Sequence, residues 1–414
     1  MSLPWHRYYR AGRGLKLPNH RCRHNSAGRP FAEGDYVILR QTRDRTAPPV
    51  YRGPLKAGGR IETHKGIIQQ DDIIGNRVRE LVRTATSRLG KAGQDFRIQD
   101  VTLDEHVRLS KRLVTPIYPA DANLIVNLLD LHPDVYDAQN PADEKLEILE
   151  AGTGHGSLTI YISRAIHAAN PPRPRPGPDE DAESMEAKIL EWKNQRKAVL
   201  HTIDVAHQYS NHARKTIAAF RHGQYLHNID FNVGSVSDWT SKALNDRESE
   251  PFLSHAFLDL PNADTHIETV AKALRVDGTL IVFNPSVTQV NECALKIKQD
   301  GIPLDLEKVV ELGVNGGSGG REWDVRPVKP RAQKLQEAAE TSAEQSEDRD
   351  SDMVEAQPEG EREQAQLAQE MTAPSDPEGK WSMVCRPKVG DRIVGGGFLG
   401  VFKKQRQRKE STDE

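Results

Sequence analysis

Short apolar runs and segments with helical periodicity alternate through the middle of the chain. Runs rich in Val, Ile, Leu and Phe, which are typical of buried strands, occur at residues 146–150, 200–204, 228–236, 256–259 and 279–284. Four helix-like segments follow these runs. One begins at Ser157, a second ends near Arg221, and the other two cover residues 265–274 and 288–299. Strands that alternate with helices predict a parallel sheet with helices on both faces, which is an α/β fold.

The region before this alternation has a different pattern. Residues 33–100 contain short β-like runs, at 36–39 and 66–68, and turn residues such as Gly58 and Gly59 lie between them. Strand-like runs that are broken by turns at short intervals predict a small β domain.

Two helices are expected between the β domain and the first strand of the α/β region. Thr102 and Glu105 have the spacing of a capping box, in which each side chain satisfies a backbone amide at the start of a helix. We expect this helix to cover residues 102–114, and a second helix to follow Pro119.

Strand-like segments return towards the end of the chain. We expect late strands at 306–314 and 322–328, on either side of the glycine-rich run Gly316–Gly320, and a last strand at 392–404.

Two polar inserts interrupt the α/β pattern, one at 170–197 and one at 335–378. The second contains fourteen Asp and Glu against two Arg, a net charge of −12, with few aromatic residues. Such a segment buries too little apolar surface to order itself, so we expect disorder. The chain then divides into a presequence at 1–32, a β domain at 33–100, the α/β domain at 101–334, the acidic insert at 335–378, a final strand at 379–405 and a tail at 406–414.

The first 32 residues carry seven Arg and Lys and no acidic residue. Arg7, Arg10, Arg13 and Lys16 recur at near-helical spacing beside aromatic residues. This pattern is typical of a mitochondrial presequence and predicts a mitochondrial location. The alternatives are a basic tail that touches RNA and a nuclear location.

Composition narrows the class of protein further. The three cysteines, Cys22, Cys293 and Cys385, form no CxxC pair, which argues against a disulfide framework or a structural zinc site and predicts a reducing compartment. No apolar run approaches the roughly 20 residues that a membrane span needs. The net charge of −3 is spread unevenly, so a nucleic-acid surface would require clustered basic residues.

The segment Glu150–Ser157 carries the first sign of chemistry. It contains Gly152, Gly154 and Gly156, follows a predicted strand and opens a predicted helix. Glycines there let the backbone approach a ligand, and the helix start offers free amides. The pattern fits a site for NAD, FAD or S-adenosylmethionine, and a tight structural turn is the alternative.

Two acids follow predicted strands. Asp204 closes the second strand, where a carboxylate can accept hydrogen bonds from both hydroxyls of a ribose. Asp259 closes the fourth strand and precedes Leu260 and Pro261. Open α/β sheets bind ligands at the carboxyl ends of their strands, so we predict a substrate role for Asp259. Capping of the following helix is the alternative for both acids.

Several segments in order make the sequence resemble the tRNA (adenine-58-N1)-methyltransferase catalytic chains, of the mitochondrial or fungal type. The late motifs are the most specific because general methyltransferases lack them. The matching segments are Gly34–Val37, Thr63–Gly66, Leu103–His106, Thr115–Asp121, Leu149–Gly154, Thr288–Val290 and Arg321–Arg326.

The resemblance implies a Rossmann-like S-adenosylmethionine methyltransferase domain behind a small N-terminal β domain. It also implies methyl transfer from S-adenosylmethionine to N1 of an adenine in the tRNA T-loop, with Asp259 as the catalytic residue, and assembly as a homo- or hetero-tetramer. The cofactor contacts that it implies are Ile117, Tyr118, Gly152, Thr153, Gly154, Gly156, Ser157, Asp204, Ser235, Val236 and Asp259.

The chain departs from the family in one contact. Many relatives carry an acid after the third strand, where this chain has Ser235, which can hydrogen-bond an adenine without a charge-assisted bond. The rival interpretations are a methyltransferase for another substrate, a non-catalytic tRNA-binding subunit and an NAD-dependent oxidoreductase.

Overall fold

The computed structural model describes residues 29–43, 47–85, 93–139, 144–174, 181–313, 321–328, 382–387 and 396–406. The chain divides into two compact units, Met1–His106 and Val107–Glu414. Most of the predicted presequence, the run Gly316–Gly320 and the acidic insert lie outside the described residues.

The N-terminal unit is a small antiparallel β structure. A four-stranded sheet has the order β2-β1-β6-β5, and β3 and β4 form a separate hairpin. Alternate side chains of β6, Phe96 and Ile98, are buried because successive residues of a strand face opposite sides, whereas Val37, Ile38 and Leu39 of β1 are all buried. The strands are β1 Val37–Gln41, β2 Val50–Arg52, β3 Arg60–Thr63, β4 Gly66–Gln69, β5 Leu81–Arg83 and β6 Asp95–Asp100.

The C-terminal unit is built on one mixed sheet, and the predicted α/β fold is confirmed. The strand order is β14-β13-β12-β15-β11-β10-β7-β8-β9. The strands from β11 to β9 in this order run parallel, whereas the four pairs from β14 to β11 are antiparallel. The strands are β7 Leu146–Ala151, β8 Ala198–Asp204, β9 Ile229–Val233, β10 Leu253–Leu258, β11 Leu274–Asn284, β12 Leu304–Glu311, β13 Arg321–Val328, β14 Ser382–Pro387 and β15 Phe398–Lys404.

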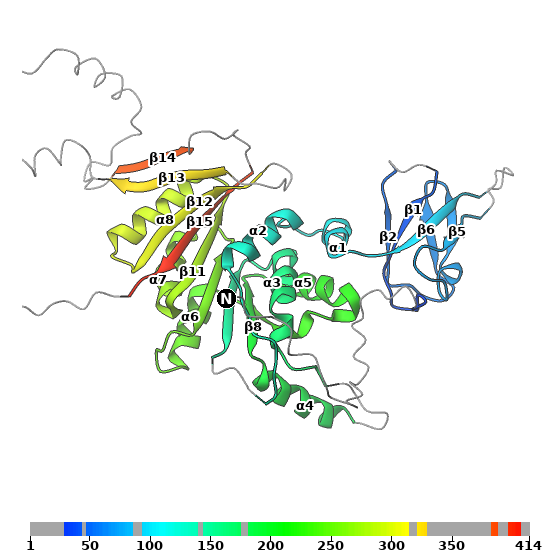
Figure 1. Cartoon of the computed structure of the whole chain (residues 1–414), viewed down its shortest axis with the longest axis horizontal. Helices are drawn as coiled ribbons and strands as arrows, with labels where there is room; N and C mark the ends of the chain where they lie inside the picture. The colour runs from blue at the N-terminus through cyan, green and yellow to red at the C-terminus, as the bar shows by residue number, and fades with distance from the viewer. Residues whose placement is uncertain are drawn as a thin grey trace, which may run out of the picture. The chain divides into compact units, whose positions relative to one another are not determined.

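Helices cover both faces of this sheet. α6, α7 and α8 pack in sequence along one face, and α2, α3 and α5 lie on the other (Figure 1). The helices are α1 Leu103–Leu109, α2 Pro119–Leu129, α3 Ser157–Ile166, α4 Ala182–Gln195, α5 His207–Ala219, α6 Val236–Asn245, α7 Asp264–Ala273 and α8 Val287–Gln299. In the described part of the chain, no helix combines the length and the apolar character needed to cross a membrane.

The strand order reverses between β7 and β10. β7 comes first among the parallel strands, its successor β8 lies on one side, and the later strand β10 lies on the other. At such a point the loops leave the two strands in opposite directions and open a crevice at the carboxyl ends. The fold therefore places a ligand site after Ala151 and Leu258.

The capping box before α1 is confirmed, but the helix is shorter than predicted. The Glu105 amide donates to the Thr102 hydroxyl at 3.2 Å, and the Thr102 amide donates to the Glu105 carboxylate at 3.2 Å. α1 ends at Leu109 and not at Val114. Directly after the helix, the Ser110 hydroxyl lies 3.0 Å from Nε2 of His155, a tertiary contact that the local pattern does not show.

The third predicted strand was too long and hid a helix. Residues 228–236 divide into β9, which ends at Val233, and the start of α6 at Val236. Gly234 has φ 141° and Ser235 caps the helix, so the strand cannot continue. Val236, Trp239 and Leu244 of α6 pack in or against the core at helical spacing, but the predicted strand was extended into the first residue of this helix.

Candidate active site

Gly152 follows β7 and packs closely against the backbone at the end of β10. It has φ +93°, and a Cβ atom on it would lie 2.0 Å from the carbonyl oxygen of Asp259. The Asp259 amide donates to the Ala151 carbonyl at 2.8 Å, which continues the β7–β10 pairing into the loop. Only glycine accommodates both the left-handed backbone and this close approach.

Gly154 and Asp204 connect the loop to β8. The Gly154 amide donates to one carboxylate oxygen of Asp204 at 3.0 Å, and the Ala206 amide donates to the other at 3.1 Å. Asp204 thus fixes the loop as well as closing its strand. Gly156, with φ +79°, lets α3 begin against α5, because a Cβ atom there would lie 2.9 Å from Cβ of Ala213.

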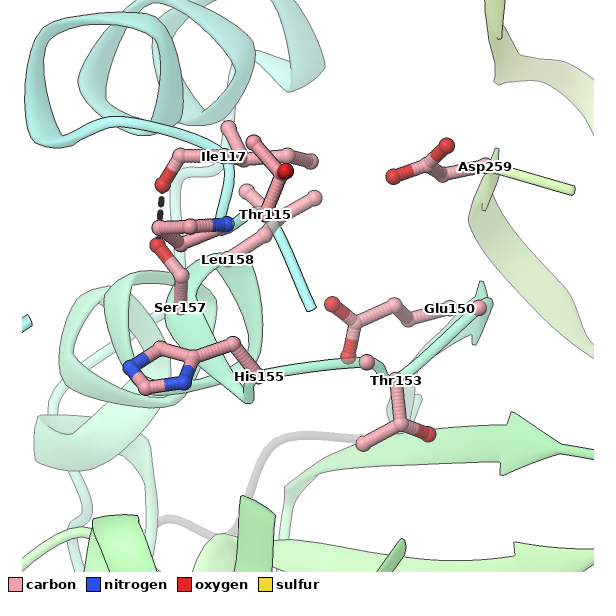
Figure 2. A pocket seen from close by; sticks show the side chains of 11 residues that line it. Thr115, Ile117, Glu150, Thr153, His155, Ser157, Leu158 and Asp259 are labelled. Carbon is pink, nitrogen blue, oxygen red and sulfur yellow. Dashed lines mark hydrogen bonds between the residues drawn. The ribbon is translucent and has the colours of Figure 1, made fainter. Parts of the chain in front are cut away.

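A pocket opens at this place, lined by the loop, the start of α3, the end of β10 and the segment before α2. Figure 2 shows the carboxylates of Glu150 and Asp259 projecting into it, opposite Thr115 and Ile117. The predicted residues that line it are Ile117, Gly152, Thr153, Gly154, Ser157 and Asp259. Thr115, Pro116, Glu150, His155 and Leu158 complete the lining.

Five predicted contacts lie outside this lining: Tyr118, Gly156, Asp204, Ser235 and Val236. Tyr118 precedes the first residue of α2, with the Arg112 guanidinium 5.7 Å from its ring centre. Ser235 accepts a hydrogen bond from the Asp238 amide at 3.4 Å and so caps α6. Val236 is buried in the hydrophobic core beneath the sheet.

The segment before α2 is held over the loop by a direct bond. The Ser157 hydroxyl donates to the backbone carbonyl of Ile117. This contact places Thr115 and Pro116 at the pocket and ties the start of α3 to the segment that covers it.

Asp259 is the predicted catalytic residue, and the structure places its side chain at the pocket. Burial raises the pKa of this carboxyl to about 6, because a partly buried carboxylate loses solvation. Above that pH the group is ionised and can accept hydrogen bonds through both oxygens.

Glu150 was missed as a site residue. It is the penultimate residue of β7 and is 1% exposed. Burial raises its pKa to about 8; the hydroxyls of Thr159 and Thr202 lower it, and the charges of Asp259 and Asp204 raise it further. The available signal was an acid inside an apolar strand, directly before the glycine loop.

His155 was missed as well. Its side chain is 2% exposed; Nε2 lies 3.0 Å from the Ser110 hydroxyl and Nδ1 lies 3.2 Å from Nε2 of His212. Burial lowers the pKa of His212, and the Lys111 backbone acts in the opposite direction. The histidine pair therefore links the loop to α5 and to the segment after α1.

The chemistry of the pocket suits a nucleoside cofactor that carries positive charge. Gly152 and Gly154 leave the loop backbone open to close approach, and Asp204 lies beside it with acceptor oxygens suited to hydroxyl groups. Asp259 supplies a carboxylate at neutral pH, and Glu150 adds a carboxyl group whose pKa burial raises to about 8. Within the described residues, no group of three or more His, Cys, Asp or Glu side chains has the arrangement of a metal site.

The fold is that of a Rossmann-like S-adenosylmethionine-dependent methyltransferase. The structure of an S-adenosylmethionine-dependent O-methyltransferase from Thermotoga maritima superposes with a TM-score of 0.52 at 16% sequence identity, covering 94% of this chain and 100% of that one. No protein-family model matches the sequence.

Sequence relatives support the resemblance to the tRNA (adenine-58-N1)-methyltransferases. The chain is 29% identical over 282 residues to tRNA (adenine(58)-N(1))-methyltransferase TrmI of Thermus thermophilus, covering 68% of this chain and 86% of that protein. It is 22% identical over 228 residues to the tRNA (adenine(57)-N(1)/adenine(58)-N(1))-methyltransferase TrmI of Methanocaldococcus jannaschii, covering 50% and 66%.

Proposed function

We propose that this chain transfers a methyl group from S-adenosylmethionine to N1 of adenine 58 in the T-loop of tRNA. The observation that carries the proposal is Asp259, which the fold places at the carboxyl end of β10 against the glycine loop of β7. TrmI of Thermus thermophilus, 29% identical over 86% of its length, suggests the substrate class.

The reaction asks the protein for alignment and charge placement. S-adenosylmethionine supplies a methyl group that is already activated as a sulfonium. The in-plane lone pair of adenine N1 forms the new bond to the methyl carbon, and the carbon–sulfur bond breaks with its electrons moving to sulfur. No proton has to leave N1, so catalysis needs no general base at that atom.

Asp259 acts on the charge that develops in the base. Methylation makes the adenine ring positive, and the exocyclic amine becomes a stronger hydrogen-bond donor. A carboxylate that accepts this bond stabilises the transition state more than the ground state. T-loop bases are stacked in folded tRNA, so the enzyme must also extract the base before it can bind.

Gly152, Gly154 and Asp204 hold the cofactor in this proposal. The loop amides and the start of α3 face the carboxylate of its methionine part, and Asp204 accepts bonds from the ribose hydroxyls. Thr115 and Ile117 close the pocket from the side opposite the two carboxylates (Figure 2).

Methyl transfer to unfractionated tRNA tests the proposal. Purified chain is incubated with labelled S-adenosylmethionine and tRNA, and the nucleosides are separated after digestion. We expect label in 1-methyladenosine. Label in another nucleoside or in protein would assign a different methyltransferase activity, and cofactor binding without transfer would assign a non-catalytic subunit.

We also propose that the basic N-terminal segment directs the chain to mitochondria. The support is seven Arg and Lys without an acid in residues 1–32. A fusion of these residues to a fluorescent protein should reach mitochondria, and nuclear or cytosolic fluorescence would contradict this.

Assembly is proposed as a tetramer of one chain or of two related chains, as the family resemblance implies. Light scattering on the purified chain checks it. A tetrameric mass indicates a homo-tetramer, and a monomer that becomes larger only with a second chain indicates the hetero form.

A further inference from the structure

Glu150 carries an oxygen that the fold leaves without a partner. Among the described residues, no group makes a hydrogen bond to Oε2 of Glu150, although this atom is inaccessible to solvent. A buried carboxylate oxygen without a partner is unfavourable by several kcal/mol when ionised, so such groups bind a proton or pair with a cation. The side chain is also one of those that line the pocket, so this oxygen lies at the edge of the space that a ligand would fill.

The surroundings of Glu150 supply no cation. Neither Lys nor Arg is among the described residues that line the pocket with it, whose polar side chains are Thr115, Thr153, His155, Ser157 and Asp259. The charges of Asp259 and Asp204 both oppose ionisation of Glu150. The two hydroxyl side chains beside it, Thr159 and Thr202, stabilise the carboxylate only in part. In the free protein at neutral pH this carboxyl is therefore mostly protonated.

We propose that Glu150 is a charge sensor for the cofactor: it holds a proton when the pocket is free, and releases it to solvent when a cationic group of S-adenosylmethionine pairs with its orphaned oxygen. This inference rests on the proposed function. The atoms balance, because the carboxylic acid loses H⁺ to buffer and the resulting carboxylate forms an ion pair. Cofactor binding is then coupled to pH through this one residue.

The coupling has a defined size and direction. With a pKa of about 8 in the free protein, the group carries about 0.9 proton at pH 7, and most of it is released on binding. Affinity for S-adenosylmethionine should rise close to tenfold per pH unit below pH 8 and level off above it. Asp259 has a pKa of about 6, so its titration is nearly complete at pH 7 and does not account for this release.

Isothermal titration calorimetry tests the proposal without turnover. S-adenosylmethionine is titrated into the full chain at pH 7 in two buffers of different ionisation enthalpy, and the difference in heat gives the protons released. Wild type should release close to one proton. Glu150→Gln, which resembles the protonated side chain, should release none and bind at least about tenfold more weakly with a flat pH dependence. Asp259→Asn should still release a proton.

The product S-adenosylhomocysteine identifies the cation. It keeps the α-ammonium but has lost the sulfonium charge. Proton release with both ligands assigns the ammonium as the partner, and release with S-adenosylmethionine alone assigns the sulfonium. Both results support the charge sensor.

Equal heats in the two buffers for wild type, or undiminished proton release by Glu150→Gln, would overturn the inference while leaving the proposed function intact. Absence of any S-adenosylmethionine binding by wild type would overturn the proposed function together with it. Thermal unfolding of Glu150→Gln checks its fold; if this variant does not fold, the wild-type heats and pH profile decide the question alone.

Discussion

At the scale of single residues, Asp259 is the group on which turnover depends most. Asp259→Asn keeps the size of the side chain but removes its charge and places a donor amide against the donor amine of adenine. We expect kcat to fall by about 10²-fold, the scale of one well-placed electrostatic group. Steady-state kinetics should show this with little change in cofactor affinity, and near-normal turnover would show that alignment alone suffices.

The pKa of Asp259 adds a pH dependence to the same residue. Burial raises the pKa to about 6, so the active carboxylate form is lost as pH falls below that value. With S-adenosylmethionine saturating, kcat/KM for tRNA, which reports groups of the enzyme before tRNA binds, should drop about tenfold per unit below pH 6 if the carboxylate is required. The Asp259→Asn variant should lack this dependence.

His155 is a second residue whose role can be measured. His155→Ala breaks the hydrogen bonds to Ser110 and His212, so it should cost about 1.5 kcal/mol of unfolding free energy and, by loosening the loop, raise KM for the cofactor. We expect kcat at saturation to stay within a few-fold, because the base contacts are untouched. The exposed His132 gives a matched control, and an unchanged KM in His155→Ala would contradict the role.

Sequence reasoning found those site residues whose chemistry is visible locally. Gly152, Gly154 and Asp259 follow strand-like runs, and topology then brings them together. Glu150 and His155 were missed because their roles depend on burial and on partners 45 or more residues away, as with Ser110 and His155. A pattern along the chain does not contain such distances.

At the scale of elements, β7, β8 and β9 are joined at their amino ends by a buried ionic network. His201 lies 2.8 Å from the Glu147 carboxylate, and Arg247 lies 3.2 Å from the same group. Arg196, 5% exposed, pairs with Asp230 at 2.8 Å on the neighbouring strand. These pairs lie at the opposite end of the sheet strands from the pocket.

Removal of Glu147 should therefore destabilise the fold without touching the site. Burial acts to raise its pKa, but the contacts with His201, Arg247 and Lys145 outweigh it and the pKa is lowered overall. Glu147→Gln removes the charge that pairs with Arg247, which is 37% exposed and so partly screened by solvent, and weakens the bond to His201, so it should cost about 1–2 kcal/mol of unfolding free energy at pH 7. The exposed Glu144 is the matched control, with an expected change below about 0.5 kcal/mol.

The sign of this contribution fixes its pH range. A carboxyl with a lowered folded-state pKa stabilises the fold above its unfolded pKa of about 4.3 and loses that contribution as pH falls through the folded value. Denaturant unfolding of wild type and Glu147→Gln should converge in acid below about pH 4. A constant difference down to low pH would contradict the ionic explanation.

Elements with strong periodicity were predicted well, and weakly patterned ones were not. β7 and α8 lie within one residue of their expected bounds. α6 was missed because the predicted strand was extended into its first residue, although Trp239 and Leu244 follow at helical spacing, and β14 was missed because only six residues pair with β13. Their positions depend on neighbours in the sheet, which local sequence does not specify.

At the scale of the whole molecule, the last strand closes the sheet. β15 lies between β11 and β12 and pairs with both, so residues at the end of the chain complete a core built much earlier. Deletion of residues 396–414 should expose both neighbours and abolish cooperative unfolding, measured by circular dichroism. A variant that still unfolds cooperatively would show that β15 is dispensable.

The acidic insert gives a separate test at this scale. Residues 335–378 carry a net charge of −12, which would repel tRNA phosphates near the site. Exchange of this segment for a Gly/Ser linker should leave tRNA methylation within a few-fold of wild type. A large loss of turnover would assign the insert a part in substrate binding or assembly.

The central claim is that methyl transfer goes to N1 of one adenine in tRNA. A tRNA transcript and a second one in which adenine 58 is replaced by guanine are each incubated with the chain and S-adenosylmethionine, and then copied by reverse transcriptase. An N1 methyl group blocks the Watson–Crick edge, so primer extension should stop at position 58 in the first transcript alone, and the Asp259→Asn variant should give about 10²-fold less stop in an initial-rate assay. The claim would be contradicted if reverse transcriptase read through position 58 of the first transcript after incubation with a chain that binds the cofactor, or if it stopped equally in both transcripts.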